Sequence, residues 1–236
     1  MTKEGFSKNL RYFYDQYTNT YLVDGIGDCL DVELSIPFEI NGSTITGIER
    51  FAFQSCKGIK SVVIPNHIRF IGEASFNYCE NLQTINIPRS VSVIEKCVFY
   101  GCKQLREITL HDCVRQIEEN AFGNCINLQS IVFPIFLLRI GRRAFFNCIR
   151  LEEVRLPVSL KVIEEGAFYC CERLSTVVVN EDIVAIGDFA FADCEKLHTL
   201  VYAGSKEQWN SVQKGQGWNR GILAKKIICK DGEVEL

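Results

Sequence analysis

The chain of 236 residues is poor in the residues on which many catalytic and metal sites depend. It has only three histidines, His67, His111 and His198, and none has the spacing of a zinc motif. Glycine-rich phosphate loops are also missing, because Gly25-Ile26-Gly27 lacks the third glycine and the following helix of a dinucleotide fingerprint. We therefore expect a protein that is not an enzyme, with no catalytic residues, cofactor or metal site.

Long apolar segments and blocks of like charge are equally absent. No run of 18 apolar residues occurs, which argues against a membrane-spanning helix. Acidic and basic residues are mixed along the chain and give a net charge of −3, so we expect no nucleic-acid partner. Residues Met1–Phe6 lack the apolar core of a signal peptide. This fits a protein that works inside a cell, or a secreted or surface protein whose leader is not part of this sequence.

The sequence does contain a repeat of 23 residues, present seven times without a shift of register. A fixed period in this range indicates a solenoid of stacked units. Three residue types form its columns: isoleucine at Ile48, Ile71, Ile94, Ile117, Ile140, Ile163 and Ile186; phenylalanine at Phe53, Phe76, Phe99, Phe122, Phe145, Phe168 and Phe191; and cysteine at Cys56, Cys79, Cys102, Cys125, Cys148, Cys171 and Cys194.

Each repeat predicts two extended segments. Alternating apolar residues such as Ile85 and Ile87 indicate a strand with one buried face, and a proline such as Pro88 ends it. A second short extended segment follows, as in Val91 to Ile94. The stretch from there to the cysteine predicts one helical or 3₁₀ turn, because it is too short for an independent helix. Stacking would form a parallel ladder along one side of the solenoid, with the second strand on another.

The repeats divide the chain into one continuous domain with three parts. Residues 1–47 are expected to form an N-terminal cap and partial repeat, residues 48–203 the seven repeats, and residues 204–236 a C-terminal cap. Asn41-Gly42 indicates a turn in the first cap, and Asp231-Gly232 indicates a hairpin in the second.

The twelve cysteines favour packing over chemistry. Seven occupy one column that would point inward, where cysteine acts as a small apolar residue, so we expect free, buried thiols. Disulfides between stacked neighbours would distort a regular layer. His111-Asp112-Cys113 is the one place where possible metal ligands crowd together, and a surface turn explains it better. Cys170 is expected to be oxidisable rather than catalytic.

The repeat closely resembles the BspA-like leucine-rich repeat, a 23-residue class found in many surface proteins. Ile140-Gly141, Ala144-Phe145, Cys148, Leu151, Val154, Leu156 and Pro157 carry the resemblance. It implies an α/β solenoid, a right-handed leucine-rich-repeat superhelix dominated by strands, and a role in adhesion or protein recognition without catalytic residues. Two repeats depart from the pattern, with His111 and Asn180 in place of the proline.

The fourth repeat carries apolar residues where other repeats are polar. Ile135, Phe136 and Leu138 occupy such columns, and Val132 precedes them on the predicted strand. Clustered exposed apolar residues mark interaction sites, so we expect these four to contact a protein partner or a second copy. The alternative is a local rearrangement in which the cap or neighbouring loops cover them. The whole chain is then a recognition or adhesion module, or else an intracellular scaffold that self-associates through the fourth repeat.

Overall fold

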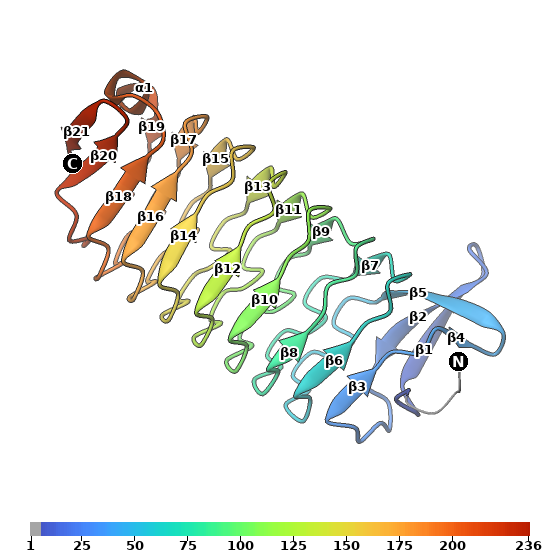
Figure 1. The fold of residues 1–236 in the computed structure, drawn as a ribbon. Helices are drawn as coiled ribbons and strands as arrows, with labels where there is room; N and C mark the ends of the chain where they lie inside the picture. The colour runs from blue at the N-terminus through green and yellow to red at the C-terminus, as the bar shows by residue number, and fades with distance from the viewer. Residues whose placement is uncertain (1–5) are drawn as a thin grey trace.

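The protein is a strand-dominated solenoid whose turns stack into a rod (Figure 1). This computed structural model describes residues 6–236. Residues 1–5, which belong to the predicted N-terminal cap and to the segment that lacks a signal-peptide core, lie outside the described part. The first of the seven repeats begins at Ile48.

The longer strand of each turn forms a parallel ladder along one side of the rod, the long-strand ladder. Each residue of this ladder pairs with the residue one repeat later in the sequence, for example Val154 with Val177. The ladder is interrupted twice, because β8 does not pair with β10 and β12 does not pair with β14. Its strands are β3 (Glu33–Ser35), β6 (Ser61–Val63), β8 (Thr84–Ile85), β10 (Glu107–Thr109), β12 (Ser130–Val132), β14 (Glu153–Arg155), β16 (Thr176–Val179), β18 (Thr199–Tyr202) and β20 (Lys226–Cys229).

The shorter strand forms a second parallel ladder, the short-strand ladder, which ends each turn at the isoleucine column. Ile117 pairs with Ile94 on one side and with Ile140 on the other. This ladder is interrupted once, between β7 and β9. Its strands are β5 (Ser43–Ile48), β7 (Phe70–Ile71), β9 (Val93–Ile94), β11 (Gln116–Ile117), β13 (Arg139–Ile140), β15 (Val162–Ile163), β17 (Ala185–Ile186) and β19 (Gln213–Lys214).

The segment between isoleucine and cysteine is not the predicted helical turn, and that prediction is wrong. Its backbone has positive φ at Asn120 (55°) and again at Asn124 (57°). Every second N–H group points to the next repeat, so that Asn120, Phe122 and Asn124 donate to Arg142, Ala144 and Phe146. An α- or 3₁₀-helix would have used these groups within the segment. The result is a third set of hydrogen bonds between repeats, the turn ladder.

The phenylalanine column stacks along the axis of the rod. All seven rings are fully buried, and neighbouring rings lie nearly parallel, with centroids 5.1 to 6.0 Å apart. Trp218 meets the last ring, Phe191, edge-on at 6.4 Å, and Trp209 packs on Trp218 at 5.8 Å. The two tryptophans therefore end the aromatic stack at the C-terminal cap.

The cysteine column contributes hydrogen bonds as well as packing. The Cys125 thiol donates to the Phe99 carbonyl at 3.1 Å, and the same bond recurs from Cys79 to Cys194. That carbonyl also accepts the N–H of Cys102, so both of its lone pairs are used in a buried layer. All twelve cysteines are free thiols. The prediction of free, buried thiols for the seven column cysteines is confirmed at six of them, whereas Cys56, in the first repeat, is only half-buried.

The two caps differ. At the N-terminal end, β1 (Arg11–Asp15) and β2 (Thr20–Gly25) form a hairpin, and β4 (Glu39–Ile40) pairs with β5 across the Asn41-Gly42 turn. At the C-terminal end, α1 (Lys206–Ser211) precedes an antiparallel pair of β20 with β21 (Gly232–Glu235). Both predicted turns are confirmed, whereas α1 was not anticipated.

The strand-dominated solenoid is thus confirmed, while the α/β label is not supported, because α1 is the one helix in the described residues. That helix is far too short and polar to cross a membrane, so residues 6–236 contain no candidate membrane-spanning helix. The right-handed sense of the superhelix and the boundaries 1–47, 48–203 and 204–236 stay predictions.

Burial should make the cysteine column unreactive in the folded protein. It raises the pKa of the Cys79 thiol to about 12, so almost no thiolate is present at neutral pH. We expect iodoacetamide to label the exposed Cys113 first and the buried column cysteines only after unfolding in urea. Mass spectrometry of the labelled peptides checks this, and rapid labelling of Cys125 in the native protein would contradict it.

Candidate interaction surface

The four apolar residues singled out in the fourth repeat are all exposed. Val132 is 79% exposed, Ile135 55%, Phe136 52% and Leu138 56%. The alternative, in which the cap or neighbouring loops cover them, is therefore not what the structure shows. Their role as a binding site stays a prediction.

The local chain explains why these side chains point outward. Phe133 and Leu137 are the buried members of the segment, and Phe133 packs edge-on against Phe145 at 5.6 Å. Pro134 ends β12, and the Leu137 N–H donates to its carbonyl to close a tight turn. Because the side chains of Phe133 and Leu137 are buried in the core, Ile135 and Phe136 lie at the exposed tip of the turn.

Neighbouring repeats hold this turn in place. The Arg115 guanidinium lies over the Phe136 ring, 5.1 Å from its centroid. The Ser159 hydroxyl donates to the Ile135 carbonyl at 3.0 Å. The exposed side chains therefore stand on a fixed support.

One member of this surface was missed from the sequence. Val158 occupies the Ile135 column one repeat later and is 67% exposed. Parallel neighbours in a ladder lie about 4.8 Å apart, so Val158 extends the exposed apolar area toward the fifth repeat. Adding 23 to the number of Ile135 would have found it. We call Val132, Ile135, Phe136, Leu138 and Val158 the apolar patch.

The apolar patch borders a hollow in the long-strand ladder. Where β12 and β14 fail to pair, a depression of about 290 Å³ opens. Val132 lines it from one side, and the ion pair of Glu153 with Arg155 lines it from the other. Apolar area bordered by an ion pair is the composition expected of a protein-binding surface, which has an apolar centre and a polar rim.

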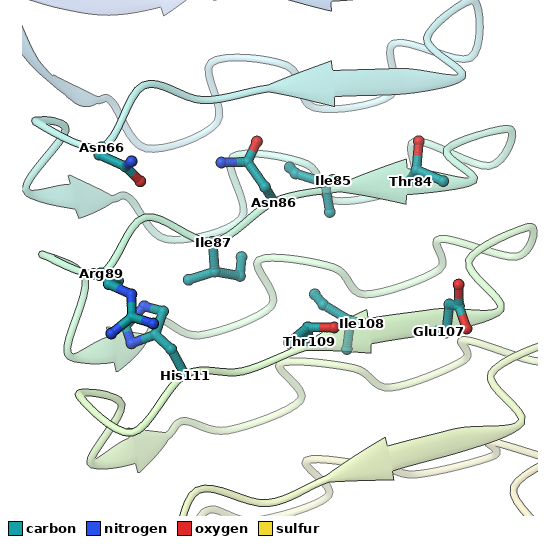
Figure 2. Close-up of a pocket in the computed structure, with 10 residues that line it drawn as sticks. All are labelled: Asn66, Thr84, Ile85, Asn86, Ile87, Arg89, Glu107, Ile108, Thr109 and His111. Atoms are coloured by element: carbon teal, nitrogen blue, oxygen red, sulfur yellow. The ribbon is translucent and has the colours of Figure 1, made fainter.

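A larger groove lies between β8 and β10, the other interruption of this ladder (Figure 2). It encloses about 430 Å³. Figure 2 shows Glu107 at one end of it and Arg89 with His111 at the other, so its charged groups do not converge on one point. It is lined by Asn66, Thr84, Ile85, Asn86, Ile87, Arg89, Glu107, Ile108, Thr109 and His111.

Asn86 and Val98 explain why the second and third repeats separate. The Asn86 amide turns back to the first repeat, where it accepts from the Ile64 N–H and donates to the Ile64 carbonyl, both at 2.7 Å. Val98 fills a buried column that holds alanine or serine in every other repeat. The extra bulk coincides with the widest ring spacing, 6.0 Å between Phe76 and Phe99. Both strand ladders stop at this junction, whereas the turn ladder crosses it.

The histidine in this groove is not free to act as a base or a ligand. His111 contacts the Pro88 carbonyl through Nε2 at 2.6 Å and accepts the Cys113 N–H at Nδ1. Asn180, the other substitute for the repeat proline, likewise donates to the Pro157 carbonyl and accepts the Asp182 N–H. Both residues therefore tie one repeat to the one before. Residues 6–236 contain no cluster of three possible metal ligands.

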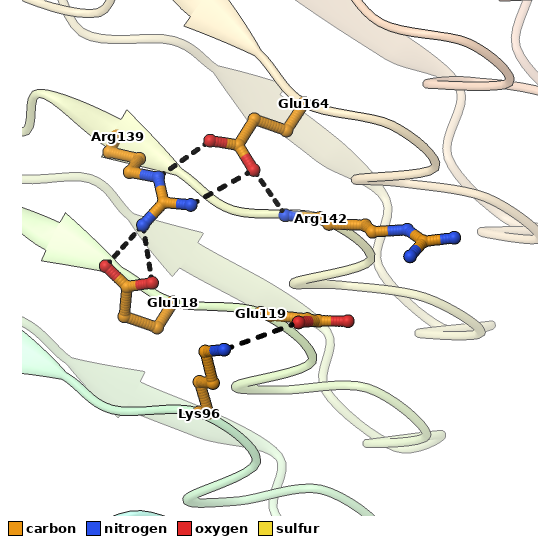
Figure 3. Close-up of polar contacts among 6 residues, drawn as sticks. All are labelled: Lys96, Glu118, Glu119, Arg139, Arg142 and Glu164. Atoms are coloured by element: carbon orange, nitrogen blue, oxygen red, sulfur yellow. Dashed lines mark hydrogen bonds and ion pairs between the residues drawn. The ribbon is translucent and has the colours of Figure 1, made fainter.

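A charged network fixes β13, the strand that follows Leu138. Figure 3 shows Arg139 between Glu118 and Glu164, with 2.7 Å contacts to an oxygen of each carboxylate. The network spans three repeats, and the residue between the two glutamates in their column is Gly141, which has no side chain. A Cβ there would lie 2.9 Å from the backbone of Glu118. Hydrogen bonding to Glu164 and to Glu118 raises the pKa of Arg139.

Removing this arginine should destabilise the rod. Arg139→Met would leave the nearly buried Glu118 without its partner, at an expected cost of about 1–3 kcal/mol in the free energy of unfolding. Arg142→Met is the matched control, because its partner Glu165 is well exposed and we expect a loss below about 0.5 kcal/mol. Urea titrations followed by circular dichroism measure both, and equal losses would argue against the bridging role.

Glu95, at the widened junction, should penalise folding at neutral pH. Burial raises the pKa of its carboxyl, and the charges of Glu118 and Glu73 raise it further. Above this raised pKa, ionised Glu95 lowers the free energy of unfolding. This destabilisation disappears when the pH falls below the pKa that Glu95 has in the unfolded chain. Glu95→Gln should therefore raise the thermal midpoint at about pH 7 and leave it unchanged at about pH 3.

The control for this prediction is Glu107→Gln, which removes the same charge from an exposed position on β10. Calorimetry at both pH values compares the two variants. A lower midpoint for Glu95→Gln at neutral pH would show that the carboxylate has a favourable partner and would contradict the prediction.

Comparisons with known proteins agree with this architecture. The crystal structure of a leucine-rich repeat protein from Bacteroides ovatus superposes with a TM-score of 0.72 at 24% identity, covering 97% of this chain and 71% of the other. The T. pallidum leucine-rich repeat protein gives 0.57 at 27% identity, covering 93% and 89%. No curated protein matches the chain.

The family assignment rests on the repeats themselves. The BspA type leucine rich repeat region matches in six copies over residues 34–141 and 117–212, which together span most of the chain. The match includes the fourth repeat and both strands that flank the apolar patch. The chain belongs to the BspA-type leucine-rich repeat family.

Proposed function

We propose that the protein is a non-enzymatic recognition or adhesion module that binds a protein partner through the apolar patch of its fourth and fifth repeats. The observation that carries this proposal is the exposure of five apolar side chains, each more than half exposed, on one stretch of an otherwise regular rod. A solenoid family supplies the scaffold for such a role.

The energetics favour binding over a purely structural role. Phe136 and Leu138 contribute little to the core, because Phe133 and Leu137 already fill it. Leaving large apolar side chains in water costs roughly 25 cal/mol per Å² of area that a partner could cover. The buried core of a protein interface is apolar and enriched in aromatic residues such as Phe136, and a rigid support lowers the entropy cost of binding.

The basic rim suggests how a partner would be oriented. Arg115 lies over Phe136, and Arg155 lines the hollow beside Val132. Cations at the edge of an apolar centre accelerate association with a partner that carries acidic residues around its own apolar contact. We expect no nucleic acid partner, since acidic residues such as Glu153 are interspersed with these cations.

The double variant Phe136→Ser/Leu138→Ser tests the proposal. Both side chains are more than half exposed, so the fold should tolerate the change, while a partner captured by the wild-type protein should bind at least about tenfold more weakly. Affinity purification with the two proteins, followed by titration of the captured partner, measures this.

Val63→Ser/Val184→Ser is the matched control, because these valines are 57% and 54% exposed and lie in the columns of Val132 and Leu138 in other repeats. If the Phe136→Ser/Leu138→Ser variant binds the partner as well as the wild type does, the proposal is contradicted. If this variant, but not the control, changes the oligomeric state, the result favours the rival function, an intracellular scaffold that self-associates through the fourth repeat.

A further inference from the structure

The N-terminal end of the rod is closed by an edge strand with a free side. β1 is antiparallel to β2, which is its only strand partner in residues 6–236. Figure 1 places it at the end of the rod farthest from α1 and β21. The backbone groups on the outer side of such a strand are available to another chain.

This end lacks the polar cover that solenoid ends usually carry. Phe13 is 54% exposed and Tyr14 43%. The opposite edge strand, β21, instead presents Glu233 and Glu235, both paired with Lys226. Charge along an edge strand prevents pairing with other chains, and terminal repeats need a polar outer face for solubility. The centre of β1, from Tyr12 to Tyr14, has no charged residue and no polar outer face.

The sequence of β1 is complementary to itself when read in the opposite direction. It runs Arg11-Tyr12-Phe13-Tyr14-Asp15. An antiparallel copy centred on Phe13 would set each Arg11 opposite Asp15 of the other chain and each Tyr12 opposite Tyr14. The two Phe13 rings would face each other on the symmetry axis. Opposite charges and aromatic residues directly across from each other are the favourable cross-strand pairs.

We propose that β1 is a homodimerisation edge, on which the β1 strand of a second copy of this chain adds antiparallel and in register about Phe13. The two-fold arrangement uses the same strand on both chains, so it closes at two and does not propagate into a filament. This surface lies at the N-terminal end of the rod, whereas the apolar patch lies in the fourth and fifth repeats, so the two surfaces do not overlap.

The residues of β1 are already positioned for this contact. Tyr14 packs on Tyr21 at 5.0 Å, and Tyr12 meets the same ring edge-on at 6.4 Å. Addition of a second strand would continue this aromatic cluster across the axis.

The two end charges are fixed as well. The Arg11 guanidinium binds the Asp24 carboxylate at 2.6 Å yet stays 64% exposed. The Asp15 carboxylate accepts the Tyr17 N–H and the Thr18 hydroxyl within the hairpin turn. Each charge thus stands at its end of the strand before a partner arrives, and little side-chain freedom would be lost on pairing.

A contact made mainly by one strand from each chain is small, so the dimer should be weak and depend on concentration. Sedimentation velocity from micromolar to near-millimolar protein measures it. The wild-type chain should shift from monomer to dimer across this range, and no larger species should form.

Two charge variants at the symmetry axis test the geometry. Phe13→Lys and Phe13→Glu each bring two like charges together on the axis, and each should weaken the dimer by about tenfold or more. Mixed in equal amounts, the two variants should form a heterodimer, because the introduced charges then face each other with opposite sign. Circular dichroism and thermal midpoints should match those of the wild type, since Phe13 is 54% exposed.

Leu30→Lys is the control, because it places a cation on a residue of the same cap outside β1 and should leave the dimer intact. The variant Phe136→Ser/Leu138→Ser should also dimerise normally. A wild-type chain that stays monomeric at the highest concentration would overturn the proposal. So would dimers that persist in both Phe13 variants, a mixture that stays monomeric, or association beyond two chains.

Discussion

Each repeat of this protein is stable only because the next one lies about 5 Å away. The stacked phenylalanine rings set that distance, with centroid spacings of 5.1 to 5.4 Å at every junction but one. At this spacing the turn ladder and the thiol-to-carbonyl bonds continue along the rod, and the strand ladders reach their partners except where β12 faces β14. A single repeat would expose its whole apolar layer, so the rings act with the hydrogen bonds to make one cooperative rod.

The cysteines show how closely the layers are matched. A thiol is the right size for the column and also supplies a donor for the Phe carbonyl of the preceding repeat. An alanine would lose the donor, and a larger apolar residue would push the layers apart. The column is therefore a second, weaker connection along the rod. Burial in this column also raises the pKa of thiols such as that of Cys125, which makes them poor nucleophiles.

The regular columns made the stacking, the two strand ladders and the free thiols predictable from the sequence. The turn ladder was missed, because positive φ at its first column is adopted by residues as different as Asn120, Arg143 and Phe189. Its second column did carry a signal, since Gly101, Asn124, Asn147 and Asp193 are of the types that adopt positive φ most readily. The apolar patch was found where apolar residues replace polar ones. Val158 escaped notice because a valine in a repeat rich in valine looks ordinary until its column is counted. The exposure of Phe136 was signalled by its column, which is polar in other repeats. The sequence did not show how the exposed turn is supported, since the contacts of Arg115 and Ser159 come from neighbouring repeats.

The junction between the second and third repeats gives the rod uneven bending stiffness. There the backbone hydrogen bonds of both strand ladders stop, while those of the turn ladder continue through Ala74, Phe76 and Tyr78. His111 and Lys103 still connect the two repeats through the Pro88 carbonyl and the Glu80 carboxylate. With fewer ladder hydrogen bonds, however, the rod should bend more easily here than at junctions where the strand ladders continue. Thermal motion should therefore concentrate at this point and swing the N-terminal end, with β1, relative to the repeats that carry the apolar patch. The two surfaces could then meet their partners at a range of mutual angles while each stays locally rigid.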